Sequence, residues 1–189
     1  HRYETSLKFK KEMEDKGLAR TEEEPFNYTL MFLANMEDDG LTLLPTHRIV
    51  EINSEINIKE TIGKYFDIQK INSSAISEKQ ARQQMLEAMN KSAHSFGMFL
   101  TNANTYYSLV FNGSKIEIDI HKCLKDLDVT VLHKLIFERL LKIDHYEYEM
   151  DPDIAVERAR KGLFEAVFFL NPTSVKDVKE VALAGQRMP

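Results

Sequence analysis

The sequence is poor in the residues that cross-link small folds or build cofactor loops. It holds one cysteine, no tryptophan, seven glycines and five prolines among 189 residues. Cys123 has no second thiol with which to form a disulfide, and no Cys or His stands at zinc-ligand spacing from it. We therefore expect a buried structural thiol in a reducing compartment rather than a nucleophile. P-loop, Gly-rich dinucleotide, HExxH and GxSxG motifs are also missing, which argues against the enzyme classes that use them.

Long apolar runs are missing as well. The longest, such as residues 30–34 and 166–170, fall far short of the roughly 20 residues that cross a bilayer. The first residues do not follow the basic, apolar and small-residue order of a signal peptide. We therefore expect no membrane partner and a cytoplasmic location.

Positive charge is in slight deficit, with 25 Lys and Arg against 30 Asp and Glu and a formal net charge of −5. Nonspecific binding to duplex nucleic acid depends on many Lys and Arg contacts with phosphates. The charge balance thus gives no strong sign of a nucleic-acid partner, although a local basic patch stays open. The content of 43% hydrophobic and 29% charged residues is that of an ordinary globular chain.

Turn and capping signals divide the chain into alternating helical and strand patterns. Helices are predicted over residues 3–16, 56–65, 77–91, 128–143 and 152–161, with a last one opening at Ser174-x-x-Asp177. Strands are predicted over residues 28–35, 41–44, 66–71, 95–101, 105–111, 114–121 and 165–171. The predicted fold class is α+β, a mixed or mainly antiparallel sheet with about six flanking helices, in one region over residues 1–189.

Two of these strands, residues 28–35 and 165–171, are nearly unbroken apolar runs, which is typical of strands covered on both faces. The first is predicted to be central in the sheet. The dipeptide Asp39-Gly40 favours a tight turn, so this run is expected to form a hairpin with residues 41–44.

His1 and Arg2 stand at the N-terminus of the first predicted helix. Unpaired backbone N–H groups and the helix dipole favour an anion there, and an arginine adds a bidentate phosphate contact. The alternative is a solvated pair at a chain end. Because the sequence opens without an initiator methionine, we expect it to be the middle to C-terminal part of a longer protein.

The segment Pro45-Thr46-His47-Arg48 brings a hydroxyl, an imidazole and a guanidinium together in an extended stretch. His47 could serve general acid or base chemistry, and Arg48 could anchor a phosphate. The structural alternative pairs Arg48 with a carboxylate.

No metal site is assigned from the sequence. Residues 37–39 are carboxylates that could hold Mg²⁺ at the end of the first apolar run, but such clusters are also common in hairpin turns. The other histidines have no partner at metal spacing and are interpreted as structural or solvent-facing: His94, His121, His133 and His145.

Several segments together match one known family. They are residues 1–5 (His-Arg-Tyr-Glu-Thr), 31–38, 44–48 (Leu-Pro-Thr-His-Arg), 127–133, 168–173 and 178–189. On these segments the chain resembles the bacterial and archaeal proteins grouped as domain of unknown function 1015. The family's opening motif reads Asp-Gly-His-His-Arg-Tyr-Glu-Thr-Ala, so His1 and Arg2 match its second His and its Arg, whereas Ser6 replaces the Ala.

That motif is similar to the phosphate-handling loop of the ParB and sulfiredoxin superfamily. The similarity implies a ligand that is a nucleotide, with Mg²⁺, or a phosphorylated small molecule, with Arg2 on a phosphate and His1 assisting. One hypothesis is therefore an enzyme or nucleotide switch whose site combines His1, Arg2, His47 and Arg48 with a preceding N-terminal part of the protein. The second is a noncatalytic binding or regulatory domain, in which these residues hold the chain against that N-terminal part.

Overall fold

The computed structural model describes residues 2–18, 21–38, 40–53, 55–72, 76–113, 119–162 and 164–189. Two compact units make up the chain, His1–Leu41 and Thr42–Pro189.

The first unit contains the helix predicted at the start of the chain. α1 (Arg2–Asp15) is followed by Gly17 in the left-handed region, with a φ of +69°. The Gly17 N–H donates to the Glu14 carbonyl at 2.9 Å, and the Leu18 N–H donates to the Met13 carbonyl at 3.0 Å. These bonds form a Schellman cap, which favours glycine because it has no Cβ to clash. The short 3₁₀ helix η1 (Pro25–Asn27) follows.

The prediction of a central buried strand over residues 28–35 is wrong. This run has no strand structure, and Leu30 is 100% and Phe32 94% exposed. Residues 41–44 form no strand either, so the predicted hairpin is also wrong; Asp39, from its turn, lies outside the described residues. None of the described residues of this unit is buried. An apolar run becomes a core strand only where other apolar surfaces cover it, and the unit supplies none.

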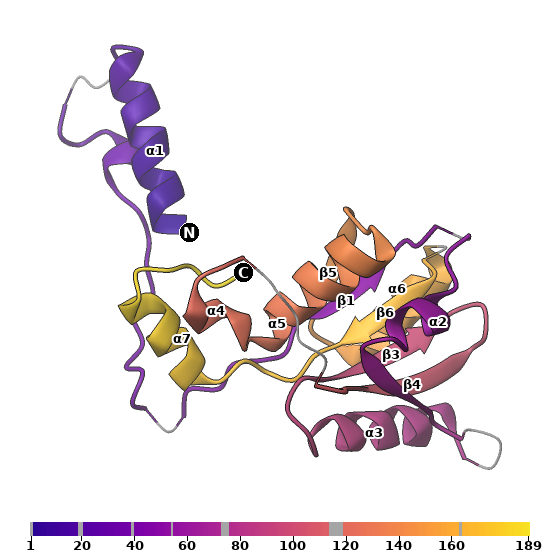
Figure 1. Ribbon diagram of the computed structural model, residues 1–189. Helices are drawn as coiled ribbons and strands as arrows, with labels where there is room; N and C mark the ends of the chain where they lie inside the picture. The colour runs from indigo at the N-terminus through magenta and orange to yellow at the C-terminus, as the bar shows by residue number, and fades with distance from the viewer. Residues whose placement is uncertain are drawn as a thin grey trace. The chain divides into compact units, whose positions relative to one another are not determined.

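The second unit is built on a six-stranded sheet (Figure 1), as counted over its described residues. The strands are β1 (His47–Val50), β2 (Phe66–Lys70), β3 (Ser95–Leu100), β4 (Thr105–Phe111), β5 (Tyr146–Glu149) and β6 (Ala166–Phe169). Their order is β2-β4-β3-β6-β1-β5, and every neighbouring pair is antiparallel. The predicted α+β class with a mainly antiparallel sheet is confirmed.

The helices of this unit begin at local signals that the sequence displays. They are α2 (Ile58–Ile62), α3 (Glu78–Met89), α4 (Lys122–Lys125), α5 (Asp128–Thr130), α6 (Pro152–Lys161) and α7 (Val175–Leu183). Ser77 and Ser174 form the capping boxes of α3 and α7, and the Asp151 side chain accepts from two backbone N–H groups of α6. α5 runs directly into η2 (Val131–Leu141), which has π-helical hydrogen bonding.

Two apolar cores cover the two faces of the sheet. α3 and α6 pack on one face, in a cluster that includes Met85, Ala155 and Ile49. Gly97 of β3 permits this approach, because a Cβ there would lie 2.6 Å from the Met85 sulfur. η2 covers the other face, in a cluster that includes Leu132 and Val50.

The strand predictions differ from the structure at three further places, residues 114–121, β1 and β5. The strand expected over residues 114–121 falls largely on residues 114–118, which lie outside the described residues, and residues 119–121 are not a strand. The strand that pairs with β4 on the side away from β3 is β2, not the segment that follows β4 in the chain. The sequence does not predict β5, at the opposite edge, because Tyr146–Glu149 alternates aromatic and acidic residues over only four positions. It does not predict β1 either, because His47–Val50 is a four-residue segment of which only the first two residues are assigned, to an extended stretch.

Candidate functional site

The sheet separates the two side chains that the sequence suggested would act together. Successive residues of a strand point to opposite faces. His47 shares its face with Ile49, which packs in the α3 and α6 core, and Arg48 shares the other face with Val50, which packs under η2. The catalytic role predicted for His47 and the phosphate contact predicted for Arg48 stay predictions, on opposite sides of β1.

His47 is a buried, neutral imidazole. It is 1% exposed, its ring lies 5.0 Å from that of Phe169, and its Nδ1 accepts from the Leu170 N–H at 3.4 Å. Burial, and next the charge of Arg48, lower the pKa of His47 to about 4. The ring is thus held by the end of β6 as an acceptor at Nδ1.

Arg48 is a buried cation whose partners within the described residues are all neutral. It is 5% exposed. Its Nε donates to Nε2 of His133 at 3.0 Å, its Nη1 donates to the Thr46 carbonyl, and its Cζ lies 4.4 Å from the centre of the Tyr148 ring. No described carboxylate forms an ion pair with it, so the alternative of an Arg48–carboxylate pair is not found among the described residues.

His133 completes this cluster from the first turn of η2. Burial, and next the charge of Arg48, lower the pKa of His133 to about 4, so the ring is neutral and its Nε2 can accept from the arginine. Its ring stacks on Phe137 with centroids 5.6 Å apart and contacts Tyr146 at 5.0 Å. π-Helical turns are frequent at functional sites. From the sequence, His133 is expected to be structural or solvent-facing, and its position beside the apolar helix stripe is the one signal of this role.

The segments that carry the family resemblance converge at this end of the sheet. Arg48, from residues 44–48, bonds to His133, from residues 127–133. His47 contacts Phe169 and the Leu170 backbone, from residues 168–173. The start of β1 lies beside the end of β6 because the two strands are antiparallel. Three segments far apart in the chain therefore form one neighbourhood.

A polar cavity of about 230 Å³ lies where β3 begins and β6 has ended. His94, just before β3, has a φ of +50°, and its Nδ1 lies 3.0 Å from Oδ1 of Asp128 at the start of α5. The hydrogen bond to Asp128 raises the pKa of His94, against the opposing effect of its burial. The remaining polar side chains of the lining are those of Ser92, Asp126, Asn171, Thr173 and Asp177.

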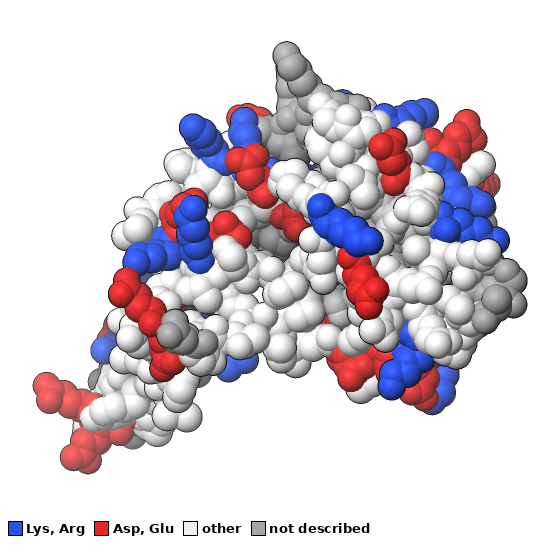
Figure 2. Space-filling model, turned by 90° about the horizontal axis from the view of Figure 1, so that it is seen from below, with Lys and Arg blue, Asp and Glu red and all other residues white. Residues whose placement is uncertain are grey.

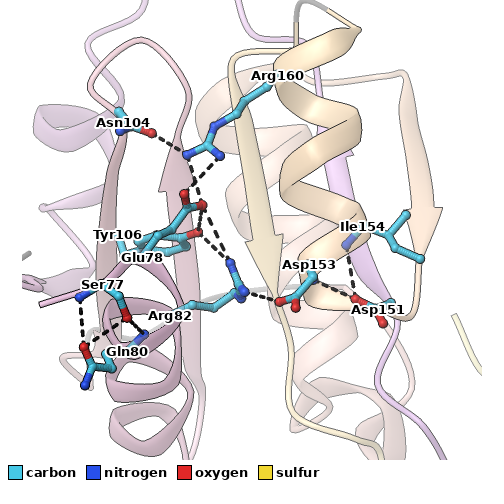
Figure 3. Close-up of polar contacts among 10 residues, drawn as sticks. All are labelled: Ser77, Glu78, Gln80, Arg82, Asn104, Tyr106, Asp151, Asp153, Ile154 and Arg160. Carbon is cyan, nitrogen blue, oxygen red and sulfur yellow. Dashed lines mark hydrogen bonds and ion pairs between the residues drawn. The ribbon is translucent and has the colours of Figure 1, made fainter.

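A second buried arginine, Arg82, differs from Arg48 because it forms ion pairs with carboxylates (Figure 3). Arg82 of α3, 8% exposed, lies between Tyr106 of β4 and Asp153 of α6. Its Nη1 donates to the Tyr106 hydroxyl at 3.1 Å, and it forms ion pairs with Asp153 and, at 3.7 Å, with Glu78. Burial raises the pKa of Tyr106 to about 12. With carboxylates on both sides, Arg82 ties two helices to the sheet, which is a structural role.

Arg2 and His1 are not part of the contacts described around Arg48 or Arg82. Arg2 is the first residue of α1 and is exposed, and His1 lies outside the described residues. Arg2 belongs to the first unit and Arg48 to the second. The expectation that the two arginines share one site stays a prediction.

Two classes of feature are missing from the described part of the chain, a membrane-spanning helix and a metal-binding cluster. Its helices include none long and apolar enough to span a membrane. Its His, Cys, Asp and Glu side chains form no group of three or more that could hold a metal ion. On the face drawn in Figure 2, acidic and basic side chains are interspersed, without a continuous patch of either sign.

The described residues thus form an α+β protein with a six-stranded antiparallel sheet, in which Arg48 is buried among neutral groups. The chain belongs to the family described as "Protein of unknown function (DUF1015)", whose profile matches residues 1–130. No curated protein matches the chain. A solved structure similar to it is a conserved hypothetical protein from Pyrococcus furiosus, with 13% identity and a TM-score of 0.45. That match covers 82% of this chain and 56% of the other, so the chain spans just over half of that protein's length.

Proposed function

We propose that the protein binds a phosphate group of a nucleotide or phosphorylated small molecule, and that Arg48 makes the contact. The observation that carries this proposal is the 5% exposure of Arg48 among neutral partners. Burying a charge is costly unless an opposite charge or strong hydrogen bonds compensate it. A phosphate would supply both.

The hydrogen bonds of Arg48 within the described residues use only part of its guanidinium. Nε and Nη1 are used by His133 and Thr46, whereas Nη2 has no hydrogen bond within the described residues. Arginine–phosphate bonds are charge-assisted and roughly twice as strong as neutral ones. The His133 bond and the Tyr148 ring fix the plane of the guanidinium, which lowers the entropy lost when an anion binds.

His133 supports an anion site by remaining neutral and by orienting the arginine. A carboxylate at its position would compete with the phosphate for the guanidinium, as Asp153 and Glu78 do at Arg82. A neutral acceptor fixes Nε and leaves the positive charge uncompensated.

We further propose, on the sequence resemblance alone, that the site is of ParB and sulfiredoxin type. In such a site Arg2 adds a second phosphate contact, His1 assists it, and Mg²⁺ accompanies the nucleotide. The function is binding, and no reaction is assigned to it.

The alternative is a noncatalytic binding domain, and a different observation favours it. The first unit has no buried residue in its described part but carries exposed apolar side chains such as Leu30 and Phe32. Exposed apolar patches of this kind mark protein interaction surfaces. In this alternative the surface packs against a further, N-terminal part of the same protein.

Calorimetric titration of the intact protein with ADP and Mg²⁺ tests the phosphate proposal, using Arg48→Gln and Arg82→Gln as a matched pair. Both arginines are buried, but only Arg82 has carboxylate partners. We expect wild-type protein and Arg82→Gln to bind, and Arg48→Gln to lose at least about tenfold in affinity, because a charged hydrogen bond is removed.

Circular dichroism of each variant controls for folding. If Arg48→Gln does not fold, Arg48→Lys keeps the charge but loses the fork geometry and should weaken binding less. Unchanged affinity in a folded Arg48→Gln variant, or no binding by the wild-type protein, would contradict the proposal.

A further inference from the structure

Tyr148 is an exposed aromatic ring directly beside the buried arginine. It lies opposite Arg48 in the antiparallel pairing of β5 with β1, so both side chains are on the η2 face of the sheet. Arg48 is 5% exposed, whereas Tyr148 is 56% exposed. β5 is the last strand of the sheet order and has β1 as its neighbour. The ring therefore stands at the sheet edge, with the arginine on its inner side.

The Tyr148 ring is held in one orientation by its neighbours. The Arg48 Cζ lies 4.4 Å from its centroid, over one face of the ring. Tyr146 contacts it edge-on, with centroids 5.5 Å apart and an interplanar angle of 75°. Tyr146 in turn packs on His133 and Phe137 of η2. A ring fixed from within the fold loses little entropy when a ligand stacks on its exposed side.

We propose that the ligand bound at Arg48 is a nucleotide and that Tyr148 is the platform on which its base stacks. This inference rests on the phosphate-binding function proposed above and adds the class of ligand. The guanidinium lies over one face of a ring that is otherwise exposed, so the pair can supply the two contacts that a nucleotide needs, one for the phosphate and one for the base.

The same geometry predicts a weak preference among bases. Stacking on an aromatic ring is tolerant of base identity because every base has a π-face. The cation–π and ring contacts of Tyr148 are with Arg48 and Tyr146, and neither side chain lies on the outer side of the ring, where it could read the edge of a base. Purine nucleotides are expected to bind somewhat more tightly than pyrimidine nucleotides through their larger stacking area.

Pyrophosphate and ADP, titrated separately into the intact protein with Mg²⁺, separate the two contacts because they share a diphosphate and only ADP has a base. We expect wild-type protein to bind ADP roughly tenfold or more tightly than pyrophosphate, as the usual strength of base stacking implies. Tyr148→Leu should bring the ratio of the two affinities close to one, because ADP loses its stacking surface. Pyrophosphate affinity should fall less than ADP affinity, since pyrophosphate loses only the ring that orients the guanidinium. Tyr148→Phe should keep the preference for ADP.

Tyr28→Leu is the matched control, since Tyr28 is also exposed, at 68%, but lies in the first unit. It should bind both ligands as the wild-type protein does. An unchanged ratio of the two affinities in Tyr148→Leu would overturn the stacking role while leaving the phosphate site intact. Equal affinities for ADP and pyrophosphate in the wild-type protein would do the same. Failure of both ligands to bind would instead remove the phosphate-binding function, and this inference with it.

Discussion

Arg48 donates a hydrogen bond from Nε to Nε2 of His133 at 3.0 Å, and this bond fixes the orientation of the guanidinium and of the imidazole ring. Burial of the ring, and next the charge of the arginine, keep the pKa of His133 at about 4, and the neutral ring in turn fixes the arginine. Protonation of His133 would place two positive charges at hydrogen-bond distance. The anion contact proposed for Arg48 should thus be unaffected by the titration of His133 near neutral pH.

The first prediction concerns acid stability. His47 and His133 both have a pKa of about 4 in the folded protein against an ordinary value of 6.5. Between these values the unfolded chain binds protons that the folded protein does not, so these groups make stability fall as the pH drops from about 6.5 to 4. Denaturant unfolding at pH 7 and pH 5 should show a smaller loss in His47→Gln than in wild-type protein.

His145 supplies the control for that experiment, because it is exposed. His145→Gln should lose as much stability between the two pH values as the wild-type protein does. The same loss in His47→Gln would mean that His47 is not buried as a neutral ring.

The second prediction concerns the His94–Asp128 pair beside the cavity. The folded pKa of His94 is raised by its bond to Asp128, so its contribution to stability is fully present below the unfolded value near 6.5. That contribution is lost as the pH rises through the folded pKa. Asp128→Asn should therefore lower stability more at pH 6 than at pH 8.5, by about 0.5–1 kcal/mol for a partly exposed pair.

Glu138→Gln removes an exposed pair with Lys134 and should cost about the same at both pH values. Thermal unfolding scans in matched buffers measure both variants. A cost for Asp128→Asn that does not vary with pH would show that the imidazole is not charged in this pair.

The third prediction concerns the exposed apolar run. Phe32 is 94% exposed and Phe96 of β3 is fully buried. Phe32→Ser should change the free energy of unfolding of this chain by no more than about 0.5 kcal/mol, whereas Phe96→Ser should cost about 3–5 kcal/mol. Urea unfolding of the two variants gives both values.

The same Phe32→Ser variant in the longer protein expected from the sequence distinguishes the alternative function. If a further part of the protein covers the run, the substitution should cost several times more there than in this chain. A loss near zero in both settings would count against that packing.

The elements that the sequence predicted well depend on neighbours in the chain. Ser77 and Ser174 cap helices by bonding to backbone groups three residues away, and Asp151 does so within three residues. The β3–β4 hairpin joins strands with only a short turn between them. The buried apolar strand predicted over residues 165–171 is found as β6, whose four residues are all buried.

The failures involve contacts between distant segments. Residues 28–35 are a largely apolar run like β6, but β6 has a neighbouring strand on each side and the first run has none among the described residues. Apolar composition indicates what a segment could bury, not whether a partner surface exists. β5 was missed because its pairing with β1, not its own four residues, makes it a strand.

The sequence by itself determined the α+β class, most helix boundaries and Arg48 as a candidate phosphate contact, since caps, turns and periodicity act over a few residues. Only the tertiary structure decided that His47 and Arg48 lie on opposite faces of the sheet, and that His133 and Tyr148 surround the arginine. Strand alternation separates the first pair, and the packing of η2 and β5 on β1 assembles the second. These contacts join residues about 85 and 100 positions apart, so they depend on how the strands pair and not on any local pattern.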